Sequence, residues 1–173
     1  MSDRGSESVH IVEEQQIISV NKFIFLSVLT FGVYELWWMY KAWRFFQQKE
    51  GSDIRPALRV VFGVIFLTSL FYKIHDFAGE RGYSKSYYSW LLFVGFFITN
   101  LLSRLPEPFW LLSLLSFIFL IPPFQALNYA MKNSTDFVVR EQTSFSNRQI
   151  GLIFVGLTMW VLVLMGMVAN EMV

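Results

Sequence analysis

The amino-acid sequence predicts an all-α protein, a polytopic membrane helix bundle in which four to five helices are embedded in the bilayer. Two observations lead to this prediction. Charged residues make up only 16% of the 173 residues while aromatic residues reach 18%, and a water-soluble surface cannot be built from so few charges. The apolar residues also gather in five charge-poor blocks, which cover residues 23–40, 60–72, 86–103, 109–131 and 149–170.

The chain divides into a polar tail and one membrane domain. Residues 1–21 are polar and net acidic and lack the basic start of a secretory signal, so we expect a flexible tail that stays on the protein. Residues 22–173 are predicted to form a single membrane domain. Its first apolar block is broken only by Glu35 and is closed by Lys41.

The blocks differ in whether they are long enough to span. A helix needs about 20 apolar residues to cross about 30 Å of hydrocarbon, and the fourth and fifth blocks reach this length. The third is slightly short, but Trp90 and Arg104 at its two ends suit the head-group boundary, so we expect it to span. The second has only 13 uncharged residues between Arg59 and Lys73, which favours a half-inserted or interfacial helix.

Prolines interrupt the chain at two places. Pro106 and Pro108 stop the third helix and start the fourth, so a tight hairpin of antiparallel helices is predicted there. Pro122 and Pro123 remove two backbone donors inside the fourth block. They are expected to kink this helix or to leave residues 124–131 at a different angle, either as a tolerated kink or as a gating hinge.

The 14 cations allow the sidedness to be argued, because Lys and Arg in short loops favour the cytoplasm. Five spans would divide them 8 against 6, and a shallow second block with four spans would divide them 11 against 3. A first block that dips in and returns, with its turn at Gly32, would leave 13 against Arg104 alone. A re-entrant backbone must be shielded from lipid by protein, so the sequence favours four spans with a shallow second block.

In every arrangement that obeys this rule, residues 41–59 face the cytoplasm. The first half of the segment places Trp43 and Phe46 near one helical face, so we expect it to continue the first helix along the head groups. Gly51 and Pro56 are expected to end that helix.

Four polar residues at membrane depth are candidates for an intramembrane site. Glu35 is the one acid inside an apolar block, and it is either an interfacial carboxylate paired with a nearby cation or a proton or cation site. Asn100, Gln125 and Asn128 are amides that either make interhelical hydrogen bonds or form a polar substrate pocket near the prolines.

Other chemistry has little support in the sequence. Asp76 and Glu80 share a helical face, but His75 points to another, and solvated loop charges explain the three. The net charge of +1 argues against a nucleic-acid partner, and the absence of cysteine removes disulfides, thiolate metal sites and thiol nucleophiles. We therefore predict no catalytic site, no metal and no cofactor.

The stretch Leu29-Thr-Phe-Gly-Val-Tyr-Glu-Leu-Trp-Trp38, followed by Tyr40-Lys41 and Trp43, resembles the start of a family of uncharacterised bacterial inner-membrane proteins. Their domain of unknown function opens with a TFGxYxxxWxYK-like helix. The turn Arg104-Leu-Pro-Glu-Pro-Phe-Trp110 is also similar. The likeness covers the chain from residue 21 to about residue 131 and implies a multi-pass protein of the inner (cytoplasmic) membrane, without implying an activity.

The leading hypothesis for function is a non-catalytic accessory or scaffold component, whose partners are membrane lipid and possible further membrane proteins or a second copy of itself. The first alternative is a small transporter or channel subunit with a polar site around the broken fourth helix. A membrane-embedded enzyme that uses His75, Asp76 and Glu80 is the third hypothesis. Small residues such as Gly151, Gly156 and Gly166 on the last helix form no GxxxG motif but allow close packing.

Overall fold

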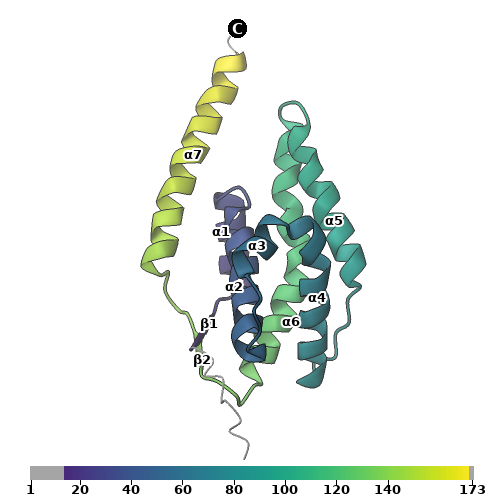
Figure 1. The fold of residues 1–173 in the computed structure, drawn as a ribbon. Coiled ribbons are helices and arrows are strands. Elements are labelled where there is room, and N and C mark those ends of the chain that lie inside the picture. Colours follow the sequence, from purple (N-terminus) through teal and green to yellow (C-terminus); the bar gives the residue numbers. More distant parts are fainter. Residues whose placement is uncertain (1–13, 172–173) are drawn as a thin grey trace, which may run out of the picture.

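A computed structural model describes residues 14–171, and this part of the chain is built almost entirely of helices (Figure 1). The predicted all-α class is therefore confirmed. Two strands of three residues each, β1 (Gln15–Ile17) and β2 (Val139–Glu141), form a short parallel pair that the sequence did not predict. The predicted tail at residues 1–21 lies outside the described residues as far as residue 13, and its last part forms β1 and the start of the first helix.

The first apolar block folds into a hairpin of two helices, α1 (Val20–Leu29) and α2 (Val33–Glu50), rather than one continuous helix (Figure 1). Gly32 has φ +84°, in the left-handed region that glycine adopts without strain, and the chain reverses there. The favoured arrangement, in which this block spans as one helix, is therefore wrong. The backbone instead reverses at Gly32, which is the turn that the dip-and-return arrangement needs.

Backbone groups at the turn of this hairpin are hydrogen-bonded within the hairpin. The Gly32 N–H donates to the Ser27 carbonyl at 2.9 Å. The Thr30 hydroxyl donates to the Leu26 carbonyl at 2.7 Å and accepts from the Tyr34 N–H at 3.0 Å. These backbone groups therefore have partners within the hairpin, which is one condition that a re-entrant turn must meet.

Aromatic rings cover the tip of the hairpin. The ring of Phe31 stacks on Trp160 at a centroid distance of 4.8 Å and on Trp110 at 6.1 Å. These two tryptophans belong to helices far away in the sequence. The tip is thus held between both of them.

The second apolar block is part of a longer structure. The short helix α3 (Pro56–Val61) ends at Phe62, and α4 (Gly63–Glu80) then runs on past Lys73. The helix predicted at residues 60–72 is therefore longer than its apolar block and continues for two more turns, while its depth in a membrane stays a prediction. The buried residues continue with helical spacing beyond the first charge, and they pack in the core as Leu67, Leu70, Phe71, Ile74, Phe77 and Ala78.

The third and fourth blocks form the predicted antiparallel hairpin (Figure 1). Its first arm is α5 (Ser89–Leu101), extended by the 3₁₀ turn η1 (Leu102–Arg104), and its second arm begins with the 3₁₀ helix η2 (Phe109–Leu120). The joint between the arms contains Pro106 and Pro108, as expected. A side chain at Gly95 would overlap the ring of Phe119, so this glycine lets the two arms approach closely.

The second arm changes its helical type near the proline pair. It continues as α6 (Ile121–Lys132), and Pro122 and Pro123 lie in the first turn of that helix. A backbone N–H has no helical acceptor in a first turn, so proline is tolerated there. The predicted interruption is present, at the boundary between a 3₁₀ and an α segment.

The last helix, α7 (Asn147–Glu171), stands apart from the bundle and packs against α1 (Figure 1). Gly156 makes this contact possible, because a Cβ built there would lie 2.5 Å from the carbonyl oxygen of Leu29. The predicted close packing through small residues is confirmed at Gly156. Gly151 and Gly166 have nothing within 4 Å of such a Cβ.

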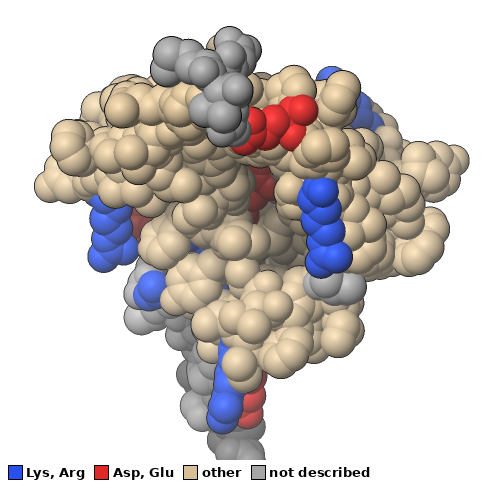
Figure 2. All heavy atoms as spheres, turned by 90° about the horizontal axis from the view of Figure 1, so that it is seen from above, with Lys and Arg blue, Asp and Glu red and all other residues tan. Residues whose placement is uncertain are grey.

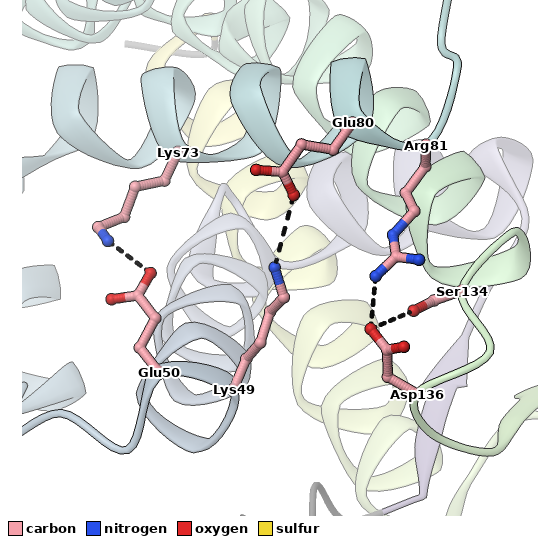
Figure 3. A network of polar contacts seen from close by, with 7 residues as sticks. All are labelled: Lys49, Glu50, Lys73, Glu80, Arg81, Ser134 and Asp136. Carbon is pink, nitrogen blue, oxygen red and sulfur yellow. Dashed lines mark hydrogen bonds and ion pairs between the residues drawn. The ribbon is translucent and has the colours of Figure 1, made fainter.

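Charged and apolar surfaces lie at opposite ends of the bundle. At the lower end in Figure 1, α2 and α4 are joined by ion pairs from Lys73 to Glu50 at 2.6 Å and from Lys49 to Glu80 at 3.9 Å (Figure 3). Arg81 adds an ion pair to Asp136 (Figure 3). The opposite end, seen from above in Figure 2, is formed mostly by uncharged residues.

Candidate functional site

Glu35 lies in the first turn of α2, close to the tip of the hairpin, and is 2% exposed. Both of its carboxylate oxygens lie 3.1 Å from the hydroxyl of Ser116, which is 3% exposed on η2. The described partner is therefore a hydroxyl and not the nearby cation that the sequence suggested. The pair joins the tip of the hairpin to the second arm.

The other three polar candidates do not gather around Glu35. The Asn100 side chain donates to the Phe96 carbonyl of its own helix at 2.9 Å. The Asn128 side chain donates to the Ile18 carbonyl at 2.9 Å, and Gln125 is half-buried on α6. The single polar cavity that a transport site at these residues requires is thus not formed in the described part of the chain.

Of the residues His75, Asp76 and Glu80, the first two lie together, with Nδ1 of His75 3.9 Å from Oδ1 of Asp76. The Nε2 of His75 lies 3.3 Å from the Ser86 hydroxyl, while Glu80 pairs with Lys49. Within residues 14–171, no group of three or more His, Asp and Glu side chains lies close enough to hold a metal ion. The geometry therefore brings His75 and Asp76 together, while Glu80 is engaged by Lys49.

A pocket of about 770 Å³ lies between α2, the β1 segment and the start of α7, and we call it the α2–α7 pocket. One part of its lining is basic and consists of Lys41, Arg44 and Arg148. A second part is formed by aromatic and aliphatic side chains, and a third by side-chain amides. The aromatic and aliphatic part consists of Trp37, Tyr40, Phe45 and Leu152. The amide part consists of Gln15, Gln16, Gln48, Gln142, Asn147 and Gln149.

The cations of the α2–α7 pocket affect one another. Lys41, Arg44 and Arg148 are exposed side chains of one pocket, and the charges of Arg148 and Arg44 act on Lys41. Glu14, a carboxylate in the described lining, already pairs with Arg140 at 3.0 Å. Lys41 and Arg148 make no ion pair with a carboxylate among residues 14–171. The described residues that line the pocket therefore carry more positive than negative charge.

A hydrogen-bond network fixes the pocket wall at the start of α7. The Ser146 N–H donates to Oε1 of Gln149 at 2.9 Å, and the Gln149 N–H donates to the Ser146 hydroxyl at 3.4 Å, which is a reciprocal capping box. The Gln149 side chain also donates to the Tyr34 hydroxyl at 3.0 Å and accepts from Gln142 at 2.6 Å. The beginning of α7 is thereby connected to α2.

Sequence reasoning missed this pocket. Its cations come from segments separated by more than 100 residues, and among them only Lys41 stands in a motif, the TFGxYxxxWxYK-like stretch. The spacing of Ser146 and Gln149 is a signal for a helix start that could have been found. Nothing in the sequence shows that the first residues of α7 lie beside α2.

Within residues 14–171, two helical stretches are long and apolar enough to cross a membrane, Phe109–Lys132 and Asn147–Ala169. Val20–Leu29 and Ser89–Arg104 are shorter apolar helices, so two of the predicted four to five membrane-embedded helices reach spanning length. These features define a helical protein with a basic pocket beside an apolar helix that can span.

The chain belongs to the family described as domain of unknown function DUF4234, whose model matches residues 18–169. The prediction of an uncharacterised domain family is thus confirmed, and the match extends beyond residue 131, where the sequence resemblance was expected to end. No curated protein and no solved structure matches the chain. The bacterial origin stays a prediction.

Proposed function

We propose that this chain is a multi-pass protein of the inner (cytoplasmic) membrane with a non-catalytic role as an accessory or scaffold component. The single observation that carries the proposal is the surface of α7, a helix of 25 residues that stands apart from the bundle. Its large apolar side chains are exposed along its length, among them Ile150, Phe154, Val155, Leu157, Val161, Leu162, Leu164, Met165 and Val168. Outside its contact with α1, this helix exposes an apolar surface that protein does not cover, and lipid stabilises such a surface.

The proposed placement uses three spans and one re-entrant hairpin. The α5–η1 arm, the η2–α6 arm and α7 cross the bilayer, while α1 and α2 enter it together and return. At 1.5 Å per residue, the 25 residues of α7 extend over about 38 Å, which is enough to cross the hydrocarbon of a bilayer with some tilt. The shorter α5–η1 arm is completed by Trp90 and Arg104, whose side chains reach the boundaries.

Charge supports this placement. With the hairpin re-entrant, 13 cations lie on one side and Arg104 lies alone on the other. The positive-inside rule then places residues 41–59, the ion pairs of α2 and α4 and the α2–α7 pocket on the cytoplasmic side.

Resistance to alkaline extraction tests the proposal. The full chain is expected to stay in the membrane pellet after a carbonate wash at high pH and to enter solution only with detergent, because its apolar helices replace water with lipid. A peripheral protein from the same membranes serves as the control that the wash must release. A purified chain that remains monodisperse in buffer without any amphiphile would contradict the proposal.

A further inference from the structure

We propose that the α2–α7 pocket binds the phosphate head group of an acidic phospholipid. The inference rests on the proposed membrane placement, which puts the pocket at the boundary between the hydrocarbon and the cytoplasm. It is carried by three features of the pocket that point to the same ligand. These are its charge, the place of Arg148 on α7, and the apolar side chains that line it beside the cations.

The charge of the pocket suits an anion. Lys41, Arg44 and Arg148 line one cavity, and Glu14 is already paired with Arg140. Cations that share a cavity repel each other, which costs free energy in the empty pocket. A phosphate group placed between them removes the repulsion and accepts charge-assisted hydrogen bonds.

Arg148 lies at a position where its charge destabilises the helix α7. Ser146 caps α7, so Arg148 lies in its first turn, where the partial positive charge of the helix disfavours a cation. The same partial positive charge at the helix end favours an anion. An arginine at this place is explained by a negative ligand that it helps to bind, since it weakens the helix otherwise.

The apolar part of the lining distinguishes a lipid from a free phosphate. Trp37, Tyr40 and Leu152 line the same pocket as the cations. Trp37 is 37% exposed and Leu152 begins the apolar part of α7, so the pocket opens toward the region assigned to lipid. Amphipathic aromatic side chains beside cations are typical of the head-group level. The volume of about 770 Å³ is within the range of small-molecule sites and accommodates a phosphoglycerol head group.

The experiment measures thermal stabilisation of the full chain, purified in a mild non-ionic detergent, during titration with dioleoyl phosphatidylglycerol. Dioleoyl phosphatidylcholine and inorganic phosphate are titrated in parallel. Phosphatidylglycerol is expected to raise the melting temperature in a saturable way, whereas the zwitterionic lipid and inorganic phosphate are not. Stabilisation by inorganic phosphate to the same extent would reassign the pocket to a soluble ligand, and equal stabilisation by phosphatidylcholine would also overturn the proposal.

A variant that replaces all three pocket cations, Lys41→Gln, Arg44→Gln and Arg148→Gln, tests the site itself. It is expected to bind phosphatidylglycerol about 100-fold more weakly. Its melting temperature without acidic lipid is expected to stay the same or rise, because the repulsion is gone. A matched variant carries Arg55→Gln, Lys85→Gln and Arg104→Gln. It removes three exposed cations outside the pocket and should keep the affinity for phosphatidylglycerol.

If the two triple variants lost affinity for phosphatidylglycerol equally, the lipid would be bound by the positive charge of the whole protein. That result would overturn the assignment of the site to the α2–α7 pocket. Both variants are also tested for resistance to the carbonate wash. A pocket variant that loses lipid binding but stays in the membrane leaves the proposed membrane role intact. A wild-type chain that resists the wash but shows no preference for the acidic lipid overturns the pocket assignment alone.

Discussion

Replacing Gly156 with alanine is expected to lower the free energy of unfolding by about 1–3 kcal/mol, because overpacking of this size is costly where the backbone cannot move away. The new Cβ would lie 2.5 Å from the carbonyl oxygen of Leu29 and 2.9 Å from its Cγ. A backbone oxygen at the end of α1 cannot rotate out of the way. The helix α7 would have to shift, and the contact between Phe31 and Trp160 would weaken.

The same substitution at two other positions of α7 is the matched control. Gly151 and Gly166 have open space around them, so alanine there is expected to stabilise the helix by about 1 kcal/mol through its higher helix propensity. Thermal unfolding of the three variants in mild detergent compares them. Equal changes at all three positions would contradict the close contact between α1 and α7.

Replacing Ser116 with alanine is expected to lower the free energy of unfolding by about 1–3 kcal/mol, because it leaves a buried polar group without its partner. Glu35 is 2% exposed, and Ser116 donates to its carboxylate. Removing the acid instead, as Glu35→Leu, is expected to cost less, because the serine hydroxyl can turn to a carbonyl of its own helix. The double variant should be more stable than Ser116→Ala alone.

Ser113→Ala is the control for this cycle. Ser113 lies one turn earlier on the same helix, and its hydroxyl donates to the Trp110 carbonyl at 2.8 Å, so its removal leaves no buried carboxylate unpaired. The four variants are compared by thermal unfolding at one pH. If the loss of unfolding free energy in the double variant equalled the sum of the losses in the two single variants, Glu35 and Ser116 would not interact.

The sequence predicted the elements whose causes are local. The hairpin at Pro106 and Pro108 and the end of α2 at Gly51 follow from single residues with a fixed effect on the backbone. The interruption near Pro122 and Pro123 was predicted for the same reason. These residues act wherever they stand, without help from distant parts of the chain.

The hairpin tip depended on distant residues and was therefore judged wrongly. Gly32 was identified as a possible turn, and the distribution of charge favoured it. The sequence could not show that Trp110 and Trp160 cover the tip or that Thr30 satisfies its backbone groups. The α2–α7 pocket was missed for a related reason, since Arg148 meets Lys41 only after α7 has returned to α2.

Cysteine accessibility tests the re-entrant hairpin most directly, because the chain has no native cysteine. Single cysteines are introduced as Asn21→Cys, Asp53→Cys, Ser84→Cys and Ser103→Cys, four exposed positions at the start of α1, after α2, before α5 and after α5. Each is labelled with a membrane-impermeant maleimide in intact cells and after permeabilisation. With five spans, positions 21 and 53 would lie on opposite sides of the membrane, and so would positions 53 and 84. With four spans and a shallow second block, position 21 would lie on one side and positions 53 and 84 on the other.

The re-entrant hairpin predicts that the cysteines at positions 21, 53 and 84 are labelled only after permeabilisation, whereas the one at position 103 is labelled in intact cells. Labelling of position 21 and position 53 from opposite sides of the membrane would contradict it.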